Sequence, residues 1–342
     1  MDDSDDNTQE LLADLEAVAL MHGFSLEDSP VPSGQHEPSI ADVPLTAIPV
    51  GTLLQEEASP PLPLQTPKPT YSVSTTFHSN SKNHDTVFVS LDLVSFYVDS
   101  SVLLSASQNA FNRLLSPEAV QAATESPYVV PIPEHSVLFN VVLHAIHQMS
   151  LDHKPPLDTL LEAIPALKRY GIREDHFIAL STPLFINILA ETPRNPISVY
   201  LAAAEHKLEH LAVASSAHLH SFELSTLTDE MANRMGPRYL QRLFRLHMER
   251  TAYLKRLLLV APTSHEDTLR CGFVEQKTLE RAWALAAASL VWEVKPDTPA
   301  GVLRSTLGSL EAQLECDECK ASLNTRVRQI VLDWLTNAKS TI

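Results

Sequence analysis

The sequence predicts an α+β protein in which a small β-sheet, covered by helices, is followed by a mainly α-helical extension. Three observations indicate this class. Short runs rich in β-branched and aromatic residues are confined to residues 86–132, and apolar residues recur at helical spacing from 135 onward. The residues before them are acidic and rich in proline.

Residues 1–82 are predicted to be an acidic, proline-rich and mostly disordered segment. Residues 1–67 contain 13 Asp and Glu and no Lys or Arg, so they carry most of the formal net charge of −17. Ten prolines fall within 30–69, where too few apolar residues remain to form a core. Within this segment, leucines at helical spacing predict a short amphipathic helix over 8–22.

Residues 83–185 are predicted to form a compact domain that begins with a β-hairpin. Two β-prone runs are separated only by Asp92 and Leu93, which indicates a tight turn between antiparallel strands. A third run contains Pro131, which favours an edge position or a bulge because proline cannot donate to a sheet. The predicted strands are 86–91, 94–98 and 128–132, and the predicted helices between them are 101–106 and 108–115.

After the third strand the chain is predicted to be helical almost to its end, with residues 186–342 forming a helical extension. Proline-containing pairs such as Asn195-Pro196 and Gly236-Pro237 separate the periodic segments. The predicted helices are 135–148, 157–170, 174–190, 196–213, 216–222, 237–259, 276–292, 299–314 and 321–338.

The predicted domain resembles the BTB/POZ domains. The resemblance lies in an acidic residue before the first strand, an aromatic second strand, a helix that begins after it, and a later leucine-rich helix. The residues that carry it are Asp85-Thr86-Val87-Phe88-Val89, Phe96-Tyr97-Val98, Val102-Leu103, Phe111, Val130-Pro131-Ile132 and Ala166-Leu167-Lys168-Arg169-Tyr170. Leu93 stands where many animal members have glycine, and Asp99-Ser100 stands in place of their His-Arg pair.

Residues 197–250 and the end of the chain, from Cys316 to Trp334, resemble the helices that follow the domain in mushroom-type (basidiomycete) fungal members. The resemblance implies a protein–protein interaction scaffold that forms a symmetric homodimer and serves as an adaptor, with a cullin-type ubiquitin ligase as one implied partner. The implied interface candidates are Val102, Leu103, Phe111 and Leu114; core positions have the same residue types, so both interpretations stay open.

The cysteines are the metal-ligand candidates. Cys316 and Cys319 have C-x-x-C spacing, Cys271 offers a third thiolate, and His265 is the nearest fourth ligand in sequence. A second C-x-x-C or H-x-x-x-H pair is missing. Three alternatives therefore stay open, namely a zinc site, a redox-active pair, and reduced thiols that pack as small apolar side chains.

His206-Lys207-Leu208-Glu209-His210 matches the short H-x-x-E-H zinc motif, which would place both histidines on one face of a helix with Glu209 as a base. The alternative is an ordinary solvated helix face, which we favour because the chain is rich in His and Glu. We therefore expect no enzyme, no catalytic or cofactor-binding residues and no small-molecule substrate; a zinc hydrolase is the least favoured alternative.

Charge and composition limit the partners. Beyond residue 67, 29 acidic and 25 basic side chains leave a net charge of −4, which gives no basic surface for direct binding to nucleic acid. The sequence has no long apolar run for a membrane, and three cysteines suit a reducing cytoplasmic or nuclear setting. A second functional alternative is a transcription-linked regulator that acts through partners bound by the acidic N-terminal helix.

Overall fold

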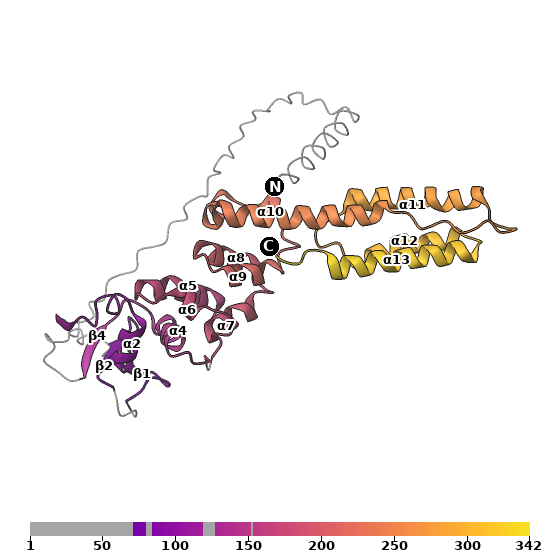
Figure 1. Ribbon diagram of the computed structural model, residues 1–342. Helices are drawn as coiled ribbons and strands as arrows, with labels where there is room; N and C mark the ends of the chain where they lie inside the picture. The colour runs from indigo at the N-terminus through magenta and orange to yellow at the C-terminus, as the bar shows by residue number, and fades with distance from the viewer. Residues whose placement is uncertain (1–70, 80–83, 119–126, 152) are drawn as a thin grey trace, which may run out of the picture. The chain divides into compact units, whose positions relative to one another are not determined.

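The computed structural model describes residues 71–79, 84–118, 127–151 and 153–342, which form a mixed α+β fold (Figure 1). The acidic segment over 1–70 and the helix predicted at 8–22 lie outside the described residues. None of the helices in the described ranges combines the length and the apolar character that a bilayer crossing requires.

The sheet has four strands in the order β1-β3-β2-β4. Strands β2 (Thr86–Val89) and β3 (Val94–Val98) pair antiparallel, which confirms the predicted hairpin. Strand β4 (Tyr128–Pro131) pairs parallel to β2 at the edge of the sheet, as its proline requires. The hairpin turn lacks glycine, and Leu93 adopts a φ of 62° in its place.

Strand β1 (Ser72–Val73), which the sequence analysis did not predict, pairs parallel to β3 at the other edge. The backbone N–H of Ser74 donates to Ser95 at 2.9 Å, and the Tyr97 N–H donates to the Phe77 carbonyl at 3.0 Å. Phe77 is buried in the core. Residues 71–79 therefore contribute to the sheet and its core although they precede the predicted domain start at 83. A two-residue strand leaves no periodic pattern in the sequence from which to predict this.

Helices α2 (Ser100–Ala106), α4 (Ser136–Ile146) and α5 (Leu157–Arg169) cover the sheet and bury a cluster of aromatic rings. Phe139 lies 5.2 Å from Phe96 and 5.3 Å from Phe88, and Phe111 stacks on Tyr170 at 4.3 Å between ring centroids. Offset stacking and edge contacts of this kind are the preferred geometries of aromatic pairs. The cluster forms the centre of the first core.

Two aspartates connect the starts of helices α2 and α4 to the hairpin through hydrogen bonds. Asp92, in the turn between β2 and β3, accepts hydrogen bonds from the Ser136 N–H at 2.8 Å and its hydroxyl at 2.6 Å, and so caps α4. Asp85 accepts from the Ser100 N–H at 2.8 Å at the start of α2. Partial burial raises the pKa of Asp92, but the hydrogen bonds from Ser136 and Ser90 outweigh it and lower the pKa to about 2.

The helix predicted at 108–115 is wrong. Residues Ala110–Arg113 all have positive φ, between 52° and 65°, so they form a left-handed turn. Side chains compensate the strain, because the Ser107 hydroxyl accepts from the Phe111 N–H at 2.8 Å and Asn109 Oδ1 accepts from the Asn112 N–H at 2.7 Å. The turn places the Phe111 ring in the core.

The helices predicted at 174–190 and 196–213 are each divided, whereas those predicted at 237–259, 276–292 and 321–338 are longer than expected. The segment 196–213 is two helices with Lys207 at a φ of 58° between them, and 216–222 contains only turns after α9. The break at Gly236-Pro237 is confirmed, since Gly236 has a φ of 66°. The elements are α6 (Glu174–Phe177), α7 (Pro183–Glu191), α8 (Pro196–Glu205), α9 (Glu209–Ser216), η1 (Leu224–Thr226), α10 (Asp229–Leu259), α11 (Phe273–Glu293), α12 (Ala300–Gly308), η2 (Ser309–Gln313) and α13 (Asp317–Asn337).

Two hydrophobic cores share helix α10. Tyr239 and Leu243 belong to the first core, which extends from Phe77, whereas Leu254 and Leu258 belong to a second core. Helices α11, α12 and α13 pack with the C-terminal half of α10 around the second core (Figure 1). The first core extends beyond the predicted domain end at 185, because α8 and α9 of the predicted helical extension pack into it.

Arg250 lies on α10 between the two cores. Its guanidinium donates to the carbonyls of Pro296 at 2.7 Å and Lys339 at 2.6 Å, and lies 4.6 Å from the centre of the Trp334 ring. Arg326 of α13 donates to the Leu257 carbonyl at 2.7 Å and so satisfies the C-terminal end of α10. These contacts fix how α11 and α13 lie along α10.

Gly171→Ala is expected to lower the free energy of unfolding by about 2 kcal/mol or more, because Gly171 has a φ of 74° and a Cβ there would lie 2.4 Å from Asn109 Oδ1. Gly301→Ala in α12 is the matched control, because a Cβ at that position meets nothing within 4 Å. Urea unfolding compares the three proteins. Equal stability of Gly171→Ala and the wild type would contradict the left-handed assignment at Gly171.

Stability is expected to fall as the pH drops below about 6.5, in part through His247. Burial, and then the nearby charge of Arg250, lower the pKa of His247, whose neutral ring donates from Nε2 to the Leu219 carbonyl at 2.9 Å. A depressed pKa means that the unfolded chain binds the proton first, so the contribution is complete above the unfolded pKa and is lost in acid.

Urea unfolding at about pH 7.5 and about pH 5.5 measures this loss. His247→Gln is expected to reduce the difference in stability between the two pH values. An unchanged difference in the variant would show that His247 does not contribute to the pH dependence.

Candidate metal centre

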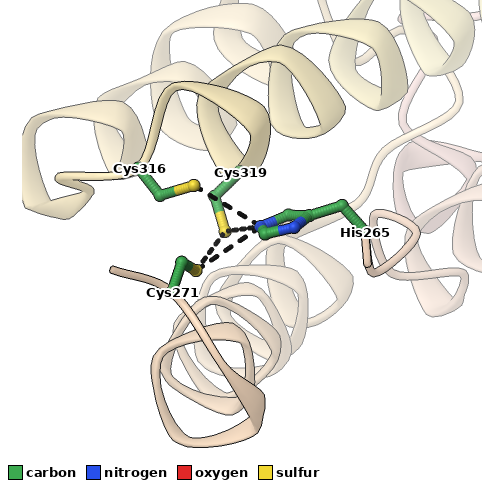
Figure 2. Close-up of side chains that lie close together, drawn as sticks. All are labelled: His265, Cys271, Cys316 and Cys319. Atoms are coloured by element: carbon green, nitrogen blue, oxygen red, sulfur yellow. Dashed lines mark hydrogen bonds between the residues drawn. The ribbon is translucent and has the colours of Figure 1, made fainter. Parts of the chain in front are cut away.

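Four side chains predicted as metal-ligand candidates lie together at one end of the second core. The ligand atoms of His265, Cys271, Cys316 and Cys319 all lie within 4.8 Å of one another. Figure 2 shows the imidazole of His265 directed at the three sulfur atoms. The first and last of these residues are 54 positions apart in the chain, so the fold rather than local sequence assembles the group.

The start of helix α13 places Cys316 and Cys319. Cys316 is the N-cap residue, and Cys319 lies in the first turn of the helix. Residues three apart across a helix start lie on the same side, which is why C-x-x-C spacing presents both sulfurs to one point. Cys319 is 3 % exposed, whereas Cys316 is half-buried.

A tight turn places Cys271 immediately before helix α11. The Thr268 N–H donates to the Cys271 carbonyl at 2.9 Å, and the Cys271 N–H donates to the Thr268 hydroxyl at 3.1 Å. Gly272 is the N-cap of α11, and its N–H donates to Glu275 Oε2 at 2.9 Å. Cys271 is 1 % exposed and belongs to the second core.

His265 lies in the segment between α10 and α11. Its Nδ1 donates to the Glu266 carbonyl at 2.7 Å, and Glu318 Oε2 lies 3.1 Å from the same nitrogen. A carbonyl oxygen can only accept, so Nδ1 carries the proton and the neutral ring presents the lone pair of Nε2. That nitrogen lies 3.3 Å from the sulfur of Cys319 and 3.4 Å from those of Cys271 and Cys316.

The separations match those of a tetrahedral metal site. Zinc–sulfur bonds of about 2.3 Å and zinc–nitrogen bonds of about 2.0 Å place tetrahedral ligands about 3.5 to 3.8 Å apart. The sulfurs of Cys271 and Cys319 are 3.6 Å apart, and the three nitrogen–sulfur distances are 3.3 and 3.4 Å. The arrangement can hold one metal ion with three sulfur ligands and one nitrogen ligand.

The local environment acts differently on the three thiols. Burial raises the pKa of Cys271 to about 12 and also raises that of Cys319. Hydrogen bonding from the backbone N–H of Cys319 lowers the pKa of Cys316, as expected for a thiol at a helix N-terminus. The hydrogen bond to the Glu266 carbonyl raises the pKa of His265.

A surface pocket gives access to the group. It has a volume of about 820 Å³ and is lined by residues of the α10–α11 segment and of α11, with Cys319 and His265 in its wall. An entry path of this kind is one of the features that a metal site needs.

The H-x-x-E-H motif does not form a site. His206 follows the end of α8, while Glu209 begins α9, so the motif spans a break and the predicted single helix face is wrong. Glu209 accepts hydrogen bonds from Arg242 at 2.6 Å, Tyr239 at 3.1 Å and Arg238 at 3.3 Å. Among the described residues, the only group with metal-ligand spacing is the one at His265.

Two of the four predicted interface residues are core residues. Leu103 and Phe111 are 0 % exposed within a single chain, which favours the core alternative that the sequence left open for them. Val102 and Leu114 are half-buried and pack against the first core, so they remain available to a partner. Core and interface leucines are alike in sequence, and only the burial distinguishes them.

One buried polar group was not found from the sequence. Glu134 is 4 % exposed, and its carboxylate accepts hydrogen bonds from Arg169 at 2.5 Å and from the Tyr170 hydroxyl. Burial, and then the hydrogen bond to Glu134, raise the pKa of Tyr170. No motif spacing identifies this contact, because Glu134 precedes α4 and its partners end α5.

Comparison of the chain with the models of protein families, with curated proteins and with solved structures finds no match in any of the three.

Glu209→Gln is expected to lower the free energy of unfolding by about 1 kcal/mol, because the carboxylate that holds Arg242 and Arg238 loses its charge while remaining partly exposed. The exposed Glu293→Gln is the matched control. Thermal and urea unfolding of both variants test this structural role. Unchanged stability in Glu209→Gln would contradict it.

Proposed function

We propose that this chain is a non-catalytic protein–protein interaction scaffold built on a BTB/POZ-like domain. The observation that carries the proposal is the chain order of the sheet. An antiparallel hairpin (β2 and β3) is followed by a short helix, and β4 then returns parallel to β2. Helices α4 and α5 follow and cover the sheet, which is the order that the sequence resemblance implies.

The polar contacts within the domain support a scaffold role, because they hold helices against the sheet and against one another. Asp92 caps α4, and Glu134 joins the start of α4 to the end of α5 through Arg169 and Tyr170. Glu134 is buried, and a buried charged group that is paired fixes how the elements around it pack. Because these carboxylates hold helices in place, we propose that the domain acts by binding other proteins at its surface.

Helix α2 offers the surface for a second copy of the chain. Leu104 is 40 % exposed, and Val102 lines a surface pocket of about 640 Å³ between α2, the end of α4 and α6. Apolar side chains of a short helix can pair with the same helix of another subunit around a twofold axis. The scaffold is therefore proposed to be a homodimer through α2, with Val102 in the interface.

Other proteins are proposed to bind the same chain in a reducing compartment, the cytoplasm or the nucleus. The resemblance implies the role of an adaptor, with a cullin-type ubiquitin ligase as the first partner to test. The three cysteines are all free thiols, which agrees with a reducing setting.

The full chain is expected to show about twice its monomer mass of 37.8 kDa by light scattering at micromolar concentrations. Val102→Glu is expected to shift the protein toward the monomer, because a charge in an apolar contact would lose its hydration. Leu285→Glu on α11 is the matched control, since Leu285 is 75 % exposed. A monomer at every concentration would contradict the dimer.

Affinity capture is then done with the wild-type chain and with Val102→Glu as baits. The captured proteins distinguish an adaptor role from self-association alone. Recovery of a cullin would support the adaptor role. Recovery of the chain alone would limit the scaffold to self-assembly.

A further inference from the structure

We propose that His265, Cys271, Cys316 and Cys319 bind one Zn²⁺ ion, which is a structural ion that fastens the α10–α11 segment to the start of α13. The proposal is independent of dimer formation, since the three cysteines lie in or against the second core and none of the four ligands lies on α2. It adds a metal site to a chain whose proposed function requires none.

The strongest argument is the crowding of three sulfurs around one nitrogen. All three lie 3.3 to 3.4 Å from His265 Nε2, as Figure 2 shows. The neutral ring has one lone pair at this nitrogen, so it can accept a hydrogen bond from only one thiol. A single ion at the centre instead uses the lone pair and all three sulfurs as ligands.

The donor set selects zinc. Three thiolates and one imidazole form one of the common tetrahedral zinc sites, whereas calcium and magnesium prefer oxygen ligands. The short distance of 3.6 Å between Cys271 and Cys319 suits one ion, because an iron–sulfur cluster would hold its ligands further apart. With all four positions filled by protein, no water is bound, and the ion is structural rather than catalytic.

The groups around the ligands also suit zinc. The proton on His265 Nδ1 is directed to the Glu266 carbonyl and to Glu318, the kind of outer contact that orients an imidazole ligand. The N-terminus of α13, where Cys316 and Cys319 lie, is positively polarised and so favours thiolates. Binding releases three thiol protons, which leaves the zinc and its ligands with a net charge of about −1.

The segment that carries His265 needs such a contact. Residues 261–272 have almost no regular structure, and Leu269 is fully exposed. Hydrogen bonds hold the segment at Thr263, whose carbonyl accepts from Ser322 at 2.6 Å, and at the His265 N–H, which donates to Gln276 at 3.2 Å. A metal ion adds bonds to α13 where apolar packing is scarce, in the manner of small zinc-stabilised domains.

A disulfide is the main competing interpretation. Cys271 and Cys319 are close enough for their sulfurs to approach one another, but a disulfide would leave Cys316 and His265 without a role. Reduced thiols that pack as small apolar groups would not require Nε2 of His265 to lie among them. Both alternatives predict that the chain binds no metal, whereas the proposed site binds one ion.

Metal analysis of the full chain, expressed with zinc in the medium and dialysed, is expected to give about one zinc per chain. His265→Ala and Cys316→Ser are each expected to reduce this to less than about a tenth. His206→Ala is the matched control and keeps the zinc, because the H-x-x-E-H motif spans a break between helices. His265→Cys is expected to retain zinc as a four-cysteine site.

Cobalt provides a second readout. Co²⁺ added to the zinc-free chain is expected to give the intense visible absorption of tetrahedral cobalt and sulfur-to-cobalt charge transfer, both absent in Cys316→Ser. Hydrogen exchange is expected to quicken after zinc removal at 261–272 and at the starts of α11 and α13, and to stay unchanged over 84–118.

Three results would overturn the proposal. The first is a zinc-supplied wild type that binds neither zinc nor cobalt. The second is zinc that is lost in His206→Ala but kept in His265→Ala, which would assign the metal to the other motif. The third is a chain mass two hydrogens lower than that of the fully reduced chain, measured on protein taken from cells without added reductant, which would show a disulfide. If Cys316→Ser fails to fold, the wild-type metal content and the His265→Cys variant still decide the matter.

Discussion

The arrangement of the described residues depends on helix α10, which contributes to two cores at once. Its residues around Leu243 pack mainly against α8 in the first core, and those around Leu258 pack against α11 and α13 in the second. Because burial of apolar surface is the main stabilising term, neither core is complete without this helix. The proposed interaction domain and the proposed zinc site therefore belong to different cores, to both of which α10 contributes.

The sequence predicted well those features that leave a local pattern. The hairpin of β2 and β3, the edge position of β4 and the break at Gly236 all follow from residue types within a few positions. Three cysteines with C-x-x-C spacing and a nearby histidine were sufficient to name all four candidate ligands. Their convergence was not predictable, because it depends on how α11 and α13 pack.

The wrong predictions also share a physical cause. The left-handed turn at Ala110–Arg113 contains no glycine, and only contacts from Ser107 and Asn109 make it tolerable. Strand β1 is too short to show periodicity, yet it brings Phe77 into the core. The burial of Leu103 and Phe111 could not be distinguished from an interface position by residue type. In each case tertiary contacts decided what local propensity could not.

The place of Arg250 between the two cores limits which insertions and deletions helix α10 can accept. Leu243, Leu246, Leu254 and Leu258 are buried along one stripe of α10, and Arg250 lies between Leu246 and Leu254 on that helix. Each residue in an α-helix turns the chain by about 100°. A single insertion or deletion near Arg250 would therefore rotate one apolar set away from its partners, whereas a change of about seven residues would preserve the phase. The length of α10 between the two cores can therefore change only in steps that preserve the helical phase.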